Sequence, residues 1–176
     1  MKERNDLIEL QNFFKENALE THYIEATKDI GIPCLCVFLN NEEAKEDADM
    51  TVFSINMLPM KLEDFQVLGI MQIYAEIETE DITLNKEDTN YLMNRMNTLI
   101  PIGQFICVDE DTDHQRIALR NVFAYNREQP IDGLLFMDEL MLLNFGINYL
   151  KTVYHILKDN SNIDKAIDTI EQMLSM

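Results

Sequence analysis

The chain has 176 residues, of which 47% are hydrophobic, and it contains only 5 glycines and 4 prolines. This composition predicts a folded domain with a substantial core rather than a disordered chain. Its 32 acidic and 14 basic residues give a net charge of −18, which repels phosphate backbones and anionic lipid surfaces, so we expect neither nucleic acid nor a membrane as partner.

The first half of the sequence predicts one helix and then strands. Residues 3–18 form the helix, because Leu7, Leu10 and Phe14 recur at helical spacing. Runs typical of strands follow around residues 22–27, 34–39, 50–58 and 65–78. The acidic stretch 40–49 and Pro59 separate neighbouring runs, and the alternation in the last two runs predicts one buried face for each.

The second half predicts three helices and two strands. Asn85 and Asp88 resemble a capping box that opens a helix, which ends before Pro101. Strands at 104–108 and 116–125, a helix at 133–157 and a final short helix complete the chain. We therefore predict an α+β fold with an antiparallel sheet of about five strands, in the order α-β-β-β-α-β-β-α plus a short C-terminal helix. We expect a single domain over residues 1–160, with the helix in 161–176 packed on the same domain.

The long helix carries two apolar stripes, which a helix covered on one side alone does not need. One stripe predicts a core-facing surface: Phe136, Leu140, Leu143, Ile147, Leu150, Tyr154 and Leu157. A second lies about 120° around the helix and predicts a surface for a partner or for a second copy of the chain: Leu135, Leu142, Tyr149, Val153 and Ile156. Met137 and Met141, beside the polar strip, join this predicted surface as adaptable side chains.

No group of residues in the sequence predicts a reaction. Asp109, Asp111 and Asp113 begin like a calcium loop, but His114 stands where that loop needs glycine. A Cys107–His114 nucleophile pair lacks a nearby positive charge to activate the thiol, and no glycine-rich phosphate loop occurs. We therefore expect no catalytic, cofactor-binding or metal-binding residues, no cofactor and no enzymatic activity.

The cysteines and the chain's polarity predict a cytoplasmic location. Cys34, Cys36 and Cys107 form no even disulfide framework, so we expect reduced thiols. The first residues lack the apolar stretch of a secretory signal. The apolar run 134–157 carries Asp138 and Glu139, each costing about 2.5–3.5 kcal/mol at a bilayer centre, so it does not predict a membrane span.

The segment from Tyr91 to about Leu157 resembles the YbjN family, which has the type III secretion chaperone-like fold. The resemblance rests on three pieces of sequence: 92–97 (LMNRMN), 102–108 (IGQFICV) and 116–120 (RIALR), followed by the long apolar helix. It implies an acidic interaction protein, commonly dimeric and sometimes described as a sensory or stress regulator. It supplies no functional residues.

These observations favour a non-enzymatic protein-interaction module, chaperone-like or regulatory, that binds a protein segment through an apolar surface and forms a homodimer. Two alternatives remain open at this point. One is a small-molecule-binding or enzymatic domain with a pocket between the sheet and the long helix. The other is a structural subunit of a larger assembly.

Overall fold

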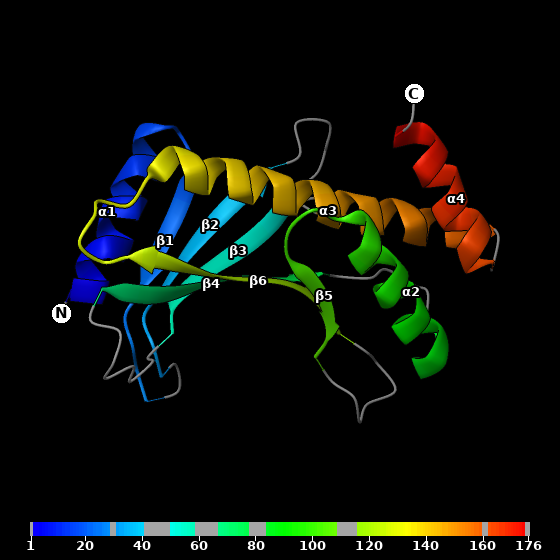
Figure 1. The fold of residues 1–176 in the computed structure, drawn as a ribbon, viewed down its shortest axis with the longest axis horizontal. Coiled ribbons are helices and arrows are strands. Elements are labelled where there is room, and N and C mark those ends of the chain that lie inside the picture. Colours follow the sequence, from blue (N-terminus) through cyan, green and yellow to red (C-terminus); the bar gives the residue numbers. More distant parts are fainter. Residues whose placement is uncertain are drawn as a thin grey trace. The chain divides into compact units, whose positions relative to one another are not determined.

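The computed structural model describes residues 2–28, 31–40, 50–58, 67–77, 84–108, 116–159 and 162–174. The acidic stretch 41–49, the turn 109–114 and the predicted boundary at residues 160–161 lie outside the described residues. The helices are α1 (Lys2–Glu16), α2 (Lys86–Leu99), α3 (Gly133–Asp159) and α4 (Ile163–Leu174) (Figure 1). The strands are β1 (Glu20–Ile24), β2 (Cys34–Asn40), β3 (Met50–Met57), β4 (Leu68–Ile77), β5 (Gln104–Cys107) and β6 (Ile117–Asn126).

The predicted α+β class is confirmed, with one antiparallel sheet of six strands in the order β1-β2-β3-β4-β6-β5. The sheet has one strand more than the predicted order, because all four strand-like runs in the first half form strands, including the run near residues 22–27, which is β1. β1 pairs with β2 along its whole length, from Glu20 opposite Phe38 to Ile24 opposite Cys34. Cross-strand pairing, more than any hydrophobic pattern of its own, therefore defines this strand.

Side chains alternate across the central strands as the sequence predicts. In β3 the buried positions are Thr51, Phe53, Ile55 and Met57, and in β4 they include Met71, Ile73, Ala75 and Ile77. The pairing of Ile55 with Ile73 and of Met57 with Met71 places these residues on one face of the sheet. The core lies on that face.

The chain divides into two compact units, and α3 contributes to both. The first unit comprises the described parts of residues 1–75 and 120–141. Here α1 contacts the start of α3 so closely that a Cβ added to Gly133 would lie 2.4 Å from the ring of Phe13. The Tyr125 hydroxyl on β6 donates a hydrogen bond to Asp6 Oδ2 of α1 at 3.0 Å. These contacts, with Phe123 against Phe136 at 5.0 Å, fix the start of α3 within this unit.

The second unit comprises the described parts of residues 76–119 and 142–176. In it, α2 packs on β5 through the side chain of Asn97, whose Oδ1 accepts from the Phe105 N–H at 2.6 Å. The Asn97 amide also donates to the Phe105 carbonyl oxygen at 3.1 Å. Because β5 ends the sheet, this side chain supplies backbone hydrogen bonds that no further strand provides. Gly146 of α3 faces the same region, since an added Cβ would lie 3.2 Å from Ile100 Cγ2.

Candidate functional site

Helix α3 begins at a side-chain cap. The Asp132 carboxylate accepts hydrogen bonds from the N–H groups of Leu134 and Leu135, at 3.1 and 3.2 Å. Capping of this kind satisfies N–H groups that have no partner inside the helix, and a negative charge there suits the helix dipole. The cap fixes where the helix starts and therefore which side chains of its first turns lie on each face.

The predicted core stripe of α3 is confirmed in full. All seven of its side chains are buried, with exposed fractions of 6% or less: Phe136, Leu140, Leu143, Ile147, Leu150, Tyr154 and Leu157. This stripe anchors the helix along its length in both units.

The second predicted stripe is exposed in the first half of the helix and half-buried or buried in the second half. Leu135 and Leu142, in the first half, are 58% and 45% exposed, and Met141 is 57% exposed. Tyr149, Ile156 and Met137 are half-buried. Val153 is completely buried, so it belongs to the core of the second unit and not to an accessible surface. In the same unit α4 follows the end of α3 (Figure 1), and Ile163, Ala166, Ile167 and Ile170 of α4 are buried as well.

Two further exposed residues complete this surface. Leu134 is 67% exposed and Phe145 is 50% exposed, and neither was assigned to a predicted stripe. Leu134, Met141 and Phe145 are separated by seven and four residues, a spacing that keeps side chains on one side of a helix. We call the five residues of 45% exposure or more the exposed α3 face: Leu134, Leu135, Met141, Leu142 and Phe145. The ring of Phe145 lies 4.7 Å from that of Tyr149, which extends the apolar surface by one turn.

Two carboxylates accompany this surface. Asp138 is exposed, and its neighbours three and four residues away are Leu134, Leu135, Met141 and Leu142, so it lies among members of the exposed α3 face. Glu139 is half-buried at its edge, and burial raises the pKa of its carboxyl above the usual range. Its Oε2 is buried without a hydrogen-bond partner among the described residues. In α3 the first basic residue is Lys151, about 20 Å along the helix from Asp138.

A second apolar surface lies on the outer side of the sheet and is weaker. Met50, Val52, Leu68 and Val122 are 37–43% exposed, each on the side opposite the buried positions of its strand or at a strand end. Polar pairs interrupt it, among them Arg120, whose Nε donates to Gln72 Oε1 at 2.8 Å. The exposed α3 face is therefore the more apolar and more accessible of the two.

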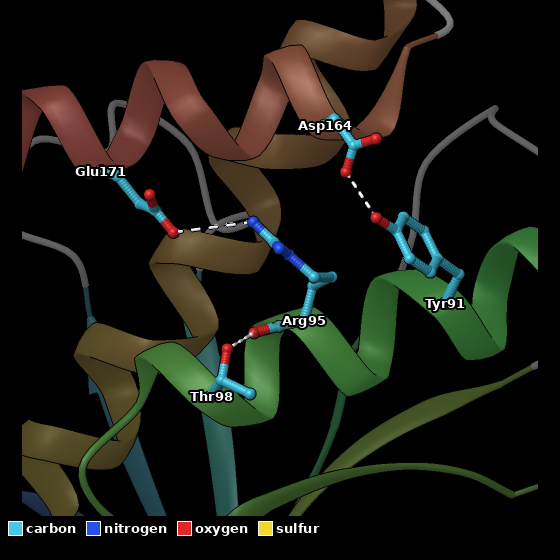
Figure 2. A network of polar contacts seen from close by, with 5 residues as sticks. All are labelled: Tyr91, Arg95, Thr98, Asp164 and Glu171. Carbon is cyan, nitrogen blue, oxygen red and sulfur yellow. Dashed lines mark hydrogen bonds and ion pairs between the residues drawn. The ribbon is translucent and has the colours of Figure 1, made fainter.

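Polar contacts between α2 and α4 fix the final helix in the second unit (Figure 2). The Tyr91 hydroxyl donates to Asp164 Oδ1 at 2.6 Å, and the Arg95 guanidinium lies 3.8 Å from the Glu171 carboxylate. The hydrogen bond to Asp164 raises the pKa of Tyr91, because the carboxylate favours the protonated phenol. Under these contacts Ile163, Ala166, Ile167 and Ile170 of α4 are buried, so α4 has no comparable apolar surface to offer at these positions.

Two of the three thiols lie next to each other on β2. Cys34 is buried with its sulfur 3.9 Å from that of Cys36, and burial raises its pKa to about 12. A thiol in such an environment stays protonated at neutral pH and reacts slowly. Cys107 contacts Asn90 through its Sγ at 3.8 Å, and His114, the other member of the pair that the sequence argued against, lies outside the described residues.

The described residues contain no cluster of three or more histidine, cysteine or acidic side chains able to hold a metal ion. They also include no helix with the length and apolarity required to cross a bilayer.

Comparison with known proteins shows a likeness in structure alone. No protein-family model and no curated protein sequence matches the chain. Among solved structures it is similar to the crystal structure of YbjN from E. coli, with 9% sequence identity and a TM-score of 0.43, over 80% of this chain and 87% of that chain. At this identity and TM-score the likeness does not establish membership of a family, and it carries no argument about function.

Proposed function

We propose that this protein is a non-enzymatic interaction module, chaperone-like or regulatory, that binds an apolar segment of another protein on the exposed α3 face. The observation that carries the proposal is the exposure of five large apolar side chains on consecutive turns of one helix, at 45–67% each. Contiguous apolar surface of this kind is uncommon on a monomer and is typical of protein-binding sites. An amphipathic partner helix would pack its own apolar side chains between these residues.

The rigidity of the support favours binding by this face. Buried and exposed residues recur along α3 at helical spacing. The buried side chains hold the backbone in place, and the side chains on the other side of the helix are free to contact a partner. Met141, in the middle of the face, has a flexible and polarizable side chain that adapts to different partner shapes. A face with this composition suits recognition of apolar segments rather than one defined sequence.

The proposal includes a reducing, cytoplasmic setting, which the number and spacing of the cysteines support. A homodimer formed through the exposed α3 face is the alternative occupant of the same surface, because a two-fold dimer is the commonest way for one surface to bury itself. Neither the sequence resemblance nor the structural likeness is needed for the proposal.

A peptide titration tests the proposed function. The probe is a fluorescein-labelled amphipathic helical peptide of about 18 residues with a leucine face and a neutral glutamine face, long enough to span the exposed α3 face. We expect saturable binding by fluorescence anisotropy, weakened about tenfold or more by Leu142→Lys, because a charge then lies in the centre of the contact. The matched control is His155→Lys, which adds a similar charge at an exposed position on the same helix. Equal binding by the wild type and both variants, or no binding at all, would overturn the proposal.

A further inference from the structure

Asp138 is an unusual residue for the position it occupies. All four of its neighbours three and four residues away on α3 are exposed apolar side chains, so any helix packed on this face must come close to its carboxylate. Asp138 makes no hydrogen bond or ion pair with another described residue. A partner that excludes water here without supplying a positive charge would leave a buried, unpaired carboxylate, which is strongly unfavourable.

From this juxtaposition we infer that the occupant of the exposed α3 face is an amphipathic helix of another protein whose apolar side carries a lysine or arginine opposite Asp138. The inference rests on the proposed function and specifies the chemistry of the partner. The spacing of the surrounding residues supports a helix as the occupant. Leu134, Asp138, Met141 and Phe145 are separated by four, three and four residues, the repeat by which one helix packs along another. A single polar residue within such a seam fixes the register and selects the partner.

Charge argues against a second copy as the occupant. Parallel pairing of two α3 helices would bring Asp138 against Asp138, and antiparallel pairing centred on Met141 and Leu142 would bury each Asp138 against Phe145. Neither arrangement supplies a cation, because α3 has no basic residue before Lys151. Each copy would also bring a net charge of −18, which opposes association. A basic helix is attracted by the same charge that repels a second copy.

Glu139 adds a second carboxylate at the edge of the face. Its neighbours four and three residues away on the helix are Leu135 and Leu142, so a cation bound at Asp138 on this side of the face would also lie near the Glu139 carboxylate. Arginine suits this arrangement better than lysine, because its planar group can contact two carboxylates at once.

The test uses three versions of the leucine-faced peptide that differ only at one central position on the apolar side, which holds Arg, Gln or Glu. For the wild type we expect the Arg peptide to bind at least about tenfold more tightly than the Glu peptide, with the Gln peptide between them, because close charge pairs at interfaces couple strongly. Asp138→Asn should remove most of this preference, and Asp138→Lys should reverse it. Added salt should weaken the Arg peptide most.

The outcomes separate this inference from the proposed function. If all three peptides bind equally and Asp138→Lys changes nothing, the basic partner is wrong and the exposed α3 face remains a binding surface. If no peptide binds the wild type, both proposals fail. If light scattering shows a wild-type dimer at tens of micromolar that Leu142→Lys dissociates, a second copy occupies the face and the inference of a basic partner is overturned.

Discussion

Two adjacent leucines on α3 should lose very different amounts of folding stability when each is replaced by alanine. Leu143 is 1% exposed and Leu142 is 45% exposed, although they are neighbours in the sequence and belong to the same unit. Leu143→Ala removes buried methyl groups and leaves a cavity, which costs about 2–5 kcal/mol. Leu142→Ala removes side-chain atoms that are nearly half in water, and alanine favours the helix slightly, so its cost is about 1 kcal/mol or less.

Urea unfolding followed by far-UV circular dichroism measures both changes under one set of conditions. We expect a clear fall in the midpoint for Leu143→Ala with little change in the slope, and a midpoint close to wild type for Leu142→Ala. In thermal unfolding the core variant should melt lower by roughly 5–15 °C, since 1 kcal/mol corresponds to about 2–4 °C in a chain of this size. The measurement is repeated at two protein concentrations. If a second copy of the chain covers Leu142, the cost of Leu142→Ala depends on concentration, whereas it does not if the same chain covers Leu142.

The comparison can refute the reasoning directly. If Leu142→Ala costs as much as Leu143→Ala at both concentrations, the residue is covered within the folded chain, and the exposed α3 face does not exist. If the cost of Leu142→Ala grows with protein concentration, the face is covered by another copy.

Three further outcomes follow from the structure. Asn97→Ala should destabilise the chain by about 2–4 kcal/mol in urea unfolding, because it leaves the N–H and the carbonyl group of Phe105 without their partner. Asn97→Asp should cost less, because it retains an oxygen that accepts from the Phe105 N–H. Gly133→Ala should lower the free energy of unfolding by about 1–3 kcal/mol, since the new Cβ would lie 2.4 Å from the Phe13 ring, and a stability equal to that of the wild type would show that this contact is not formed. Cys34, whose pKa is raised to about 12, should react with a thiol reagent at pH 8 far more slowly in the native chain than in urea. The stability that its protonated form contributes should be fully present below its unfolded pKa of about 8.5 and be lost as the pH rises towards 12, and fast native labelling of Cys34 would contradict its burial.

Periodicity predicted the buried side of α3 correctly and its outer side only in part. The spacing of apolar residues gives their angles around the helix, and all seven core positions followed from it. It does not show how far another element extends along the helix. Val153 and Leu142 were placed in one stripe, yet the first is completely buried and the second is 45% exposed. That difference depends on tertiary packing in the second unit, which no local pattern encodes.

Other features escaped sequence reasoning for similar physical reasons. The bounds of β1 were among them: a strand was predicted around residues 22–27, and its pairing with β2 places it at Glu20–Ile24, because a strand with few apolar residues has a weak pattern of its own. Asn97 lies in a segment that suggested only a family resemblance, whereas its role is to complete the hydrogen bonding of β5. Leu134 and Phe145 were missed because neither falls on the spacing of the two predicted stripes, and their exposure depends on the tertiary packing around α3.

The most direct test of the central claim is a methyl NMR titration of the full chain, labelled at leucine, valine and methionine methyl groups, with the leucine-faced Arg peptide. The account predicts that the largest shift changes occur at Leu134, Leu135, Met141 and Leu142, with those of Val52 and Val122 on the outer side of the sheet unchanged. Shift changes confined to Val52, Leu68 and Val122 would assign binding to the sheet instead, and the claim that the exposed α3 face is the binding site would be wrong.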